Sequence, residues 1–117
     1  MTALVIPLRQ RQSSNTFSQT DIAELHRWSY SAARARLFLQ TDYDPQTGEE
    51  RWIGRADCGS EYISVADGSP NSRLLCAVTP ERAQWVLRDR RHEPLDTFGS
   101  LRAALEAVYQ MFGCGAV

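Results

Sequence analysis

One apolar stripe near the C-terminus constrains the fold of this chain more than any other feature. Its residues are separated by three, four, three and four positions, which keeps them on one face of an α-helix: Phe98, Leu101, Leu105, Val108 and Phe112. Ser100 is a suitable N-cap, and Gly113 is placed to end the helix in a left-handed conformation. The spacing predicts a helix over 100–112 that buries one face against a sheet.

Four earlier segments have the period-two alternation, or the β-branched and aromatic composition, of strands. They are 34–41, 51–56, 61–66 and 74–78. A proline- and glycine-containing turn at 44–48 separates the first two segments and predicts an antiparallel hairpin. The solvated side of this hairpin would carry Arg34, Arg36, Arg51 and Arg55.

A first helix is predicted from Asp21, because Asp21 and Glu24 have the spacing of a capping box. Helical spacing of apolar residues continues through Leu25. The pattern weakens after Trp28, so the helix is expected to end between Trp28 and Ala33.

Residues 79–91 fit two structures. Thr79, Pro80 and Glu81 are the residue types that begin many helices, which would give a helix over 80–90. The alternation over 84–89 fits a strand instead, followed by a turn and a short return to Phe98. We favour the strand, and the helix stays open as the alternative.

The length of 117 residues and the apolar fraction of 43% fit one globular domain. The predicted class is α+β, with an N-terminal helix, an antiparallel meander sheet of four to five strands, and a C-terminal helix packed on one sheet face. Residues 1–19 are expected to form a flexible or strand-adding N-terminal arm. Residues 20–117 are expected to form a single α+β domain.

Charge and cysteine content indicate the cellular setting. The net charge of −1 argues against general polyanion binding, and all 13 basic residues are arginine. An arginine-only set suits phosphate recognition, but it also fits a GC-rich bacterial genome. The three cysteines lack CxxC spacing, so we expect reduced thiols in a cytoplasmic protein. No segment has the length of a membrane span, and no membrane partner is expected.

No catalytic or cofactor motif stands out in the sequence. The acidic turn at 42–50 fails the calcium-loop pattern. A zinc site would have to combine residues whose spacing fits no finger or ribbon, namely Cys58, Cys76, Cys114 and His92. We therefore predict no metal and no cofactor, and favour a non-enzymatic role over an enzyme.

The densest basic cluster is the segment 82–92. Combined with the basic arm and two tryptophans, it forms a candidate partner- or nucleic-acid-binding site made of Arg9, Arg11, Arg82, Arg88, Arg90, Arg91, His92, Trp52 and Trp85. The arginines would contact phosphates and the aromatic rings would stack on bases. Acidic residues interleave with the cluster and weaken its field, so a plain solvated surface stays open as the alternative.

Three function classes are ranked. The leading hypothesis is a small non-enzymatic protein-interaction or accessory protein, acting through an open sheet face or edge on another protein or on a second copy of itself. Tryptophan and arginine side chains at the surface are typical of such interfaces. The second is a nucleic-acid-associated regulator that uses the arginine-rich 82–92 segment and the basic N-terminal arm. The third is an enzyme of unknown class.

Overall fold

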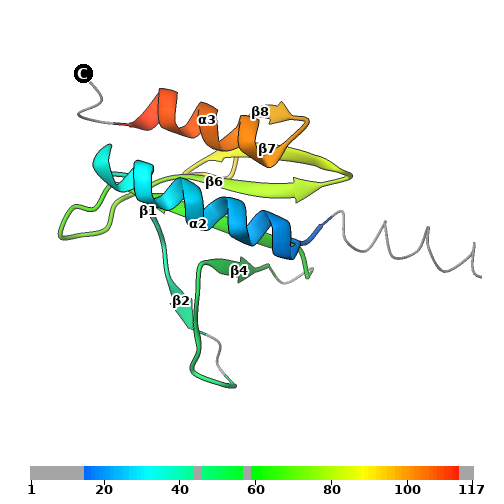
Figure 1. Ribbon diagram of the computed structural model, residues 1–117, viewed down its shortest axis with the longest axis horizontal. Helices are drawn as coiled ribbons and strands as arrows, with labels where there is room; N and C mark the ends of the chain where they lie inside the picture. The colour runs from blue at the N-terminus through cyan, green and yellow to red at the C-terminus, as the bar shows by residue number, and fades with distance from the viewer. Residues whose placement is uncertain (1–14, 44–45, 57–58, 114–117) are drawn as a thin grey trace, which may run out of the picture.

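The computed structural model describes residues 15–43, 46–56 and 59–113. Two helices lie on the same side of an antiparallel sheet, and the C-terminal helix packs on that sheet (Figure 1). The predicted α+β class is therefore confirmed. Arg9 and Arg11 lie outside the described residues, as do Cys58 and Cys114.

The main sheet is an antiparallel meander in which two short strands, β1 and β4, share one edge position beside β5. Its strand order is β1-β5-β6-β7-β8, and β4 also pairs with β5. The strands are β1 (Phe38–Leu39), β4 (Ile53–Arg55), β5 (Glu61–Ala66), β6 (Leu74–Glu81), β7 (Gln84–Asp89) and β8 (Pro94–Phe98). The short strands β1 and β4 both pair with β5 on the side away from β6, which explains why the sheet has more strands than the sequence predicts.

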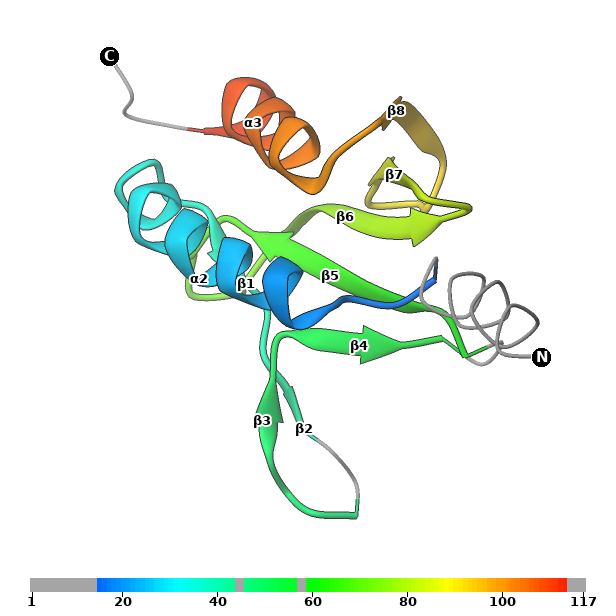
Figure 2. The ribbon, with the colours of Figure 1, turned by 45° about the vertical axis from the view of Figure 1, so that its right-hand side comes forward.

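Between β1 and β4 the chain leaves the sheet as a separate hairpin. Its strands, β2 (Asp42–Tyr43) and β3 (Glu50–Arg51), pair only with each other and project from the body (Figure 2). We call residues 42–51 the β2–β3 arm. The described part of the predicted turn, residues 46–48, does join two paired strands. The predicted pairing of 34–41 with 51–56 is wrong, because both flanking segments pair with β5 instead.

The first helix, α2 (Gln19–Arg34), is longer at both ends than the sequence predicts. Ser18 is its N-cap: the Ser18 hydroxyl accepts from the Asp21 N–H at 3.1 Å, and the Asp21 carboxylate accepts from the Ser18 N–H at 2.9 Å. Asp21 is thus the acid of the capping box rather than the cap. Arg34 is the last residue of the helix, and the backbone turns at Arg36 with a φ of 63°. The strand predicted from Arg34 therefore begins only at Phe38.

The corrected boundaries move the arginines predicted on one hairpin face. Arg34 ends α2, Arg36 is in the following turn, Arg51 is in the arm and Arg55 ends β4. These side chains therefore do not form a common solvated face.

The predicted strand in the ambiguous 79–91 region is confirmed, and the helix alternative is wrong. Strand β6 continues through Pro80, and the chain reverses at Arg82 and Ala83, whose φ angles are 51° and 66°. Two central residues with positive φ give the turn geometry that suits the twist of a β-hairpin. Pro80 is tolerated because it lies beyond Val78, the last β6 residue that pairs with β5.

Helix α3 (Leu101–Phe112) forms as its apolar spacing predicts, with the Ser100 hydroxyl accepting from the Ala103 N–H at 3.1 Å. It packs on β6, β7, β8 and α2. The predicted left-handed conformation of Gly113 is wrong, since its φ is −66°. A glycine suits this position because an added Cβ would lie 2.5 Å from the Tyr109 carbonyl oxygen.

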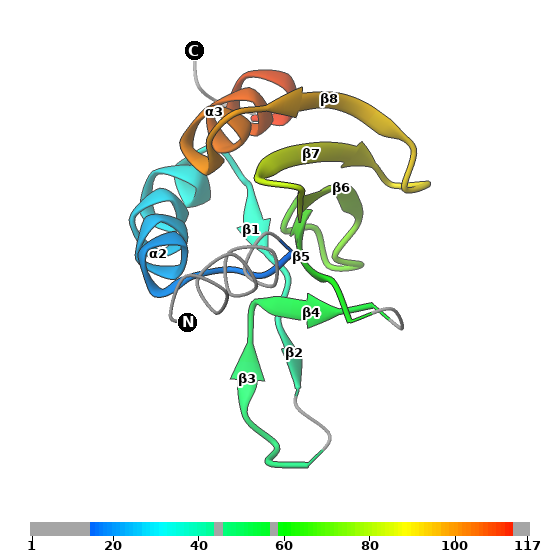
Figure 3. The same ribbon diagram turned by 90° about the vertical axis from the view of Figure 1, so that its right-hand side faces the viewer.

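The core lies between the two helices and the sheet face that they cover (Figure 3). Its largest fully buried side chains come from both helices, from β5, β6 and β7, and from the turn between α2 and β1: Leu25, Leu37, Ile63, Val65, Cys76, Val78, Leu87, Leu105 and Val108. Phe17, at the end of the predicted N-terminal arm, also belongs to this core. Among the described residues, no helix combines the length and apolarity needed to cross a membrane.

Candidate functional site

The best-formed hollow of the described surface is a groove between α2 and β4. It has a volume of about 490 Å³, and we call it the α2–β4 groove. Its lining comes from α2, from the strands β3, β4 and β5, and from the segments that lead into them: Phe17, Ile22, Leu25, His26, Thr41, Glu50, Arg51, Trp52, Ile53, Arg55 and Glu61. The groove lies where α2 leaves the β4 end of the sheet partly uncovered.

The interior of the groove is apolar. Leu25 is fully buried beneath it, and Ile22 and Ile53 are half-buried against the core. Phe17 closes one side, and its ring packs on Trp85 with centroids 5.3 Å apart. An apolar concavity of this size, edged by a few polar groups, is typical of a binding site.

An aromatic contact joins the helix to the strand across the groove. The rings of His26 on α2 and Trp52, which precedes β4, have centroids 4.6 Å apart and planes tilted by 47°. Trp52 is half-buried, so it offers apolar surface to a ligand while its other side packs on the protein. This contact fixes the position of the β4 edge relative to α2.

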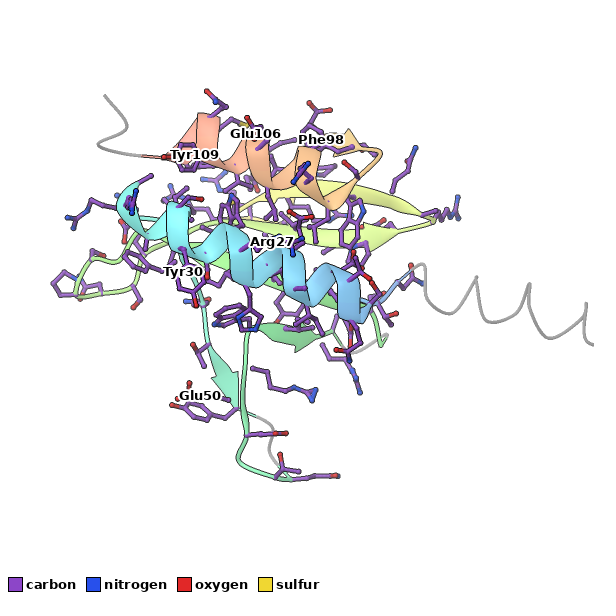
Figure 4. The ribbon with its side chains drawn as sticks, in the orientation of Figure 1. Arg27, Tyr30, Glu50, Phe98, Glu106 and Tyr109 are labelled. Atoms are coloured by element: carbon purple, nitrogen blue, oxygen red, sulfur yellow. The ribbon has the colours of Figure 1, made fainter. Side chains whose placement is uncertain are left out.

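Charged groups form the rim of the groove. The Glu61 carboxylate accepts from the Phe17 N–H at 2.7 Å and lies 3.4 Å from the Arg55 guanidinium. Glu61 therefore ties the chain that leads into α2 to the end of β4. Glu50 adds a further carboxylate to the rim, and it lies on the projecting arm, well away from α3 (Figure 4).

The backbone of β4 is free to pair along its outer side. The Ala56 N–H donates to the Ser60 carbonyl at 2.8 Å, which places Ala56 in a hydrogen-bonded pair. Because such pairs alternate with non-bonded ones in an antiparallel ladder, the N–H and C=O groups of Ile53 and Arg55 face away from β5. No strand among the described residues pairs with that outer side.

The opposite edge of the sheet, β8, is protected by contrast. Pro94 begins it, and the Asp96 carboxylate accepts from the Thr97 N–H at 2.7 Å. Proline, charge and an occupied N–H are the usual means of preventing edge-to-edge pairing. The structure thus leaves β4, and not β8, as the receptive edge.

The sheet face away from the helices carries polar side chains near its centre, and these side chains form hydrogen bonds with one another. Arg88 donates to the Glu81 carboxylate at 2.5 Å, to the Thr79 hydroxyl at 3.4 Å and to the His92 carbonyl at 3.0 Å. The Arg88 guanidinium beside Glu81 holds the pKa of that carboxyl below its usual value. Arg88 is therefore engaged within the protein.

A second contact on this face explains the glycine of β4. Tyr62 is paired with Gly54, and its ring lies over the Gly54 backbone. A Cβ added at Gly54 would lie 2.6 Å from the Tyr62 Cζ atom. The ring thereby covers the sheet at a position that has no side chain of its own.

The structure does not gather the predicted basic residues into one patch. Arg82 is in the turn before β7, whereas Arg90, Arg91 and His92 are in the turn after it. The six residues of β7 separate the two groups by about 20 Å. Arg90 and Arg91 instead lie near Arg73, around a hollow of about 440 Å³.

The two predicted tryptophans lie near the groove, and Trp85 also follows Arg82 by three positions in the β6–β7 hairpin. Trp52 lines the α2–β4 groove, and Trp85 packs on Phe17, which lines it too. Phe17, His26, Ile53 and Glu61 are groove residues that sequence reasoning missed. Phe17 gives one usable signal, because it is the one aromatic residue in an otherwise polar stretch that precedes a helix.

The thiol and acidic groups in the described part of the chain form neither a metal site nor a reactive thiol. No three His, Cys, Asp or Glu residues within the described ranges converge as a metal site would require. Cys76 is fully buried in β6, and burial raises the pKa of its thiol to about 12. It therefore acts as a small core residue, which is the common role of an isolated cysteine on a strand.

No protein-family model, curated protein or solved structure matches this chain.

Proposed function

We propose that this chain is a small non-enzymatic interaction or accessory protein. It binds an extended segment of another protein along the β4 edge and takes alternate side chains of that segment into the α2–β4 groove. The observation that carries the proposal is the position of an unpaired edge strand directly beside an apolar groove.

This combination suits one mode of recognition. A peptide that adds a strand to a sheet edge gains affinity from main-chain hydrogen bonds and specificity from pockets for every second side chain. The outward groups of Ile53 and Arg55 offer the hydrogen bonds, and the apolar groove offers the pocket. A small molecule would use the groove alone and would leave the edge unpaired.

The proposed setting is the bacterial cytoplasm, with another protein or a second copy of this chain as the partner. The arginine-only basic set and the buried, unpaired Cys76 support this setting. A homodimer fits the same mode, because the β4 edge of one copy would receive a segment of the other.

Selection from a library of random decapeptides tests the proposal. We expect the enriched peptides to alternate apolar and polar residues and to shift the backbone amide resonances of Ile53 and Arg55 and the Trp52 indole resonance. Failure to enrich any peptide would contradict the proposal. Shifts confined to the Arg73, Arg90 and Arg91 hollow would also contradict it.

One observation favours nucleic-acid association as the second candidate. Arg73, Arg90 and Arg91 come from two different loops and surround one hollow, where a phosphate could bridge them. Binding of mixed single-stranded DNA at low salt, lost steeply by about 200 mM salt, would support this candidate. Equal binding by an Arg90→Gln, Arg91→Gln variant would reject this hollow as the site.

A further inference from the structure

The register of β4 decides which side chains of an added strand enter the α2–β4 groove. Ile53 is paired with Ile63, which is fully buried in the core, so the side chains of Ile53 and Arg55 lie on the sheet face that the helices cover. A residue that pairs directly with one of them places its own side chain on the same face. An added strand therefore presents every second side chain to the groove, at the positions opposite Ile53 and Arg55.

We infer that the bound segment of the partner protein has an acidic residue opposite Arg55 and an apolar residue opposite Ile53. In antiparallel pairing each of these two residues exchanges both of its outward hydrogen bonds with a single partner residue. In that direction the segment reads acidic, polar, apolar from its N-terminus. The inference deepens the proposed function and rests on it for pairing at the β4 edge. It makes one exception to the alternation of apolar and polar residues, because one position that faces the groove is acidic.

The position opposite Ile53 meets the apolar interior of the groove. Ile22 on α2 and Ile53 on β4 are half-buried, and Leu25 is fully buried beneath the groove. Trp52, which precedes Ile53, also lines the groove and is half-buried. An apolar side chain gains free energy by leaving water at this position, whereas a charged side chain would lose its hydration without a partner.

The position opposite Arg55 meets a cation at the rim. The Arg55 side chain is 63% exposed, and its contact with the Glu61 carboxylate at 3.4 Å uses one nitrogen of a guanidinium that has several N–H donors. The Glu61 side chain is only 14% exposed, and its carboxylate accepts from the Phe17 N–H at 2.7 Å. A carboxylate on the segment therefore reaches Arg55 from the solvent side, whereas a lysine or arginine there would face a like charge.

The charges of the arm lie at the other end of the groove. Glu50 and Arg51 form β3, which precedes Trp52, and both line the groove. The Glu50 carboxylate accepts from the Tyr43 hydroxyl at 3.2 Å. Glu50 and Arg51 have opposite signs and add no net charge. Because Arg55 is much more exposed than Glu61, it sets the charge that the segment meets at the β4 end.

The middle residue of the segment lies opposite Gly54 and points to the other face of the sheet. A hollow of about 350 Å³ lies beside Gly54, and most of its lining side chains are polar: Gln40, Thr41, Trp52, Tyr62 and Ser64. A polar middle residue suits this lining. The β4 edge thus has a hollow beside it for each of the two directions in which the side chains of an added strand point.

Selection from a random decapeptide library on three full-length proteins tests the inference. Wild type is compared with Arg55→Glu and with the matched control Arg27→Glu. Arg27 is also 63% exposed and also lies 3.4 Å from a carboxylate, that of Glu24, but it is not part of the groove lining. We expect wild type and Arg27→Glu to enrich Asp or Glu two positions before an apolar residue, and Arg55→Glu to enrich Lys or Arg at that position. The same preference in all three proteins would overturn the inference.

A second measurement uses wild-type protein and one enriched peptide, so it needs no protein variant. Replacing the acidic residue of the peptide by Lys should weaken binding about tenfold, because an attraction at an exposed site becomes a repulsion. The peptide of reversed sequence should also bind about tenfold or more weakly, because its side chains meet the wrong positions.

The outcomes separate the inference from the proposed function. Equal dissociation constants for the parent and either altered peptide would overturn the inference, and shifts of the Ile53 and Arg55 amide resonances by those peptides would still support strand addition at β4. Failure of the library to enrich any peptide on any of the three proteins would overturn the proposed function, and the inference with it.

Discussion

The imidazole of His26 packs on the indole of Trp52 with ring centroids 4.6 Å apart. His26 belongs to α2, and Trp52 is where the β2–β3 arm returns to the sheet as β4. This contact spans the α2–β4 groove and joins the helix to the receptive edge. Loss of the contact between His26 and Trp52 should therefore leave the β4 edge less firmly positioned relative to α2.

A double-mutant cycle measures that contact. His26→Ala and Trp52→Ala should couple by about 0.5–1.5 kcal/mol in the free energy of urea unfolding, as offset or tilted ring pairs do. The mutation pair His26→Ala and Trp85→Ala is the control, because Trp85 packs on Phe17 instead. A His26–Trp52 coupling no larger than the control would show that the rings do not stabilise one another.

The stacking of Tyr62 on Gly54 predicts a rescue. Gly54→Ala should destabilise the protein by about 1–3 kcal/mol, because its Cβ would collide with the Tyr62 ring 2.6 Å away. The same change in a Tyr62→Ala background should cost much less. Gly99→Ala is the control, because no described atom lies within 4 Å of a Cβ added there. The prediction fails if Gly54→Ala costs the same in both backgrounds.

The Glu81–Arg88 pair predicts a pH dependence of stability. The pKa of Glu81 is lower in the folded protein than its ordinary 4.5, so the pair stabilises the fold above that value and loses its effect as the pH falls through the folded pKa. Because Glu81 is 42% exposed, the coupling should stay below about 1 kcal/mol at pH 7. A cycle of Glu81→Gln and Arg88→Met, followed by urea unfolding at neutral and strongly acidic pH, checks this. Equal coupling at both pH values would contradict it.

Cys76 should resist thiol reagents in the native state. In a Cys58→Ser, Cys114→Ser background, the Cys76 thiol should react only when the protein unfolds, because its pKa is raised to about 12. The unfolded thiol ionises near pH 9.0, so the stability that the neutral thiol provides is present below that pH and is lost as the pH rises towards 12. Rapid labelling of the folded protein at pH 8 would contradict the burial of Cys76.

Much of the fold could be predicted from local spacing. The stripe from Phe98 to Phe112 and the composition of 61–66 each depend on neighbours in sequence, and α3 and β5 form accordingly. The N-cap of α2, Ser18, lies three residues before the predicted one, because Ser18 and Asp21 satisfy the same capping pattern as Asp21 and Glu24. Local spacing cannot distinguish two such overlapping caps.

The edge of the sheet and the groove could not be predicted, because distant residues create them. The segment around Arg51 to Ala56 has a strand composition, but only its pairing with β5 shows that it shares that side of the sheet with β1. His26 meets Trp52, and Phe17 meets Trp85, across separations that no motif encodes. The arginines of 82–92 are close in sequence, but β7 holds them apart in space.

Replacement of Arg55 tests the central claim most directly. Arg55→Pro removes the outward N–H of β4 without removing a donor to β5, whereas Arg55→Ala removes the same side chain and keeps that N–H. A peptide selected on the wild-type groove should bind Arg55→Ala with a Kd within a few-fold of wild type, and bind Arg55→Pro about tenfold or more weakly. Equal dissociation constants for two folded variants would contradict strand addition at β4 as the function of this protein.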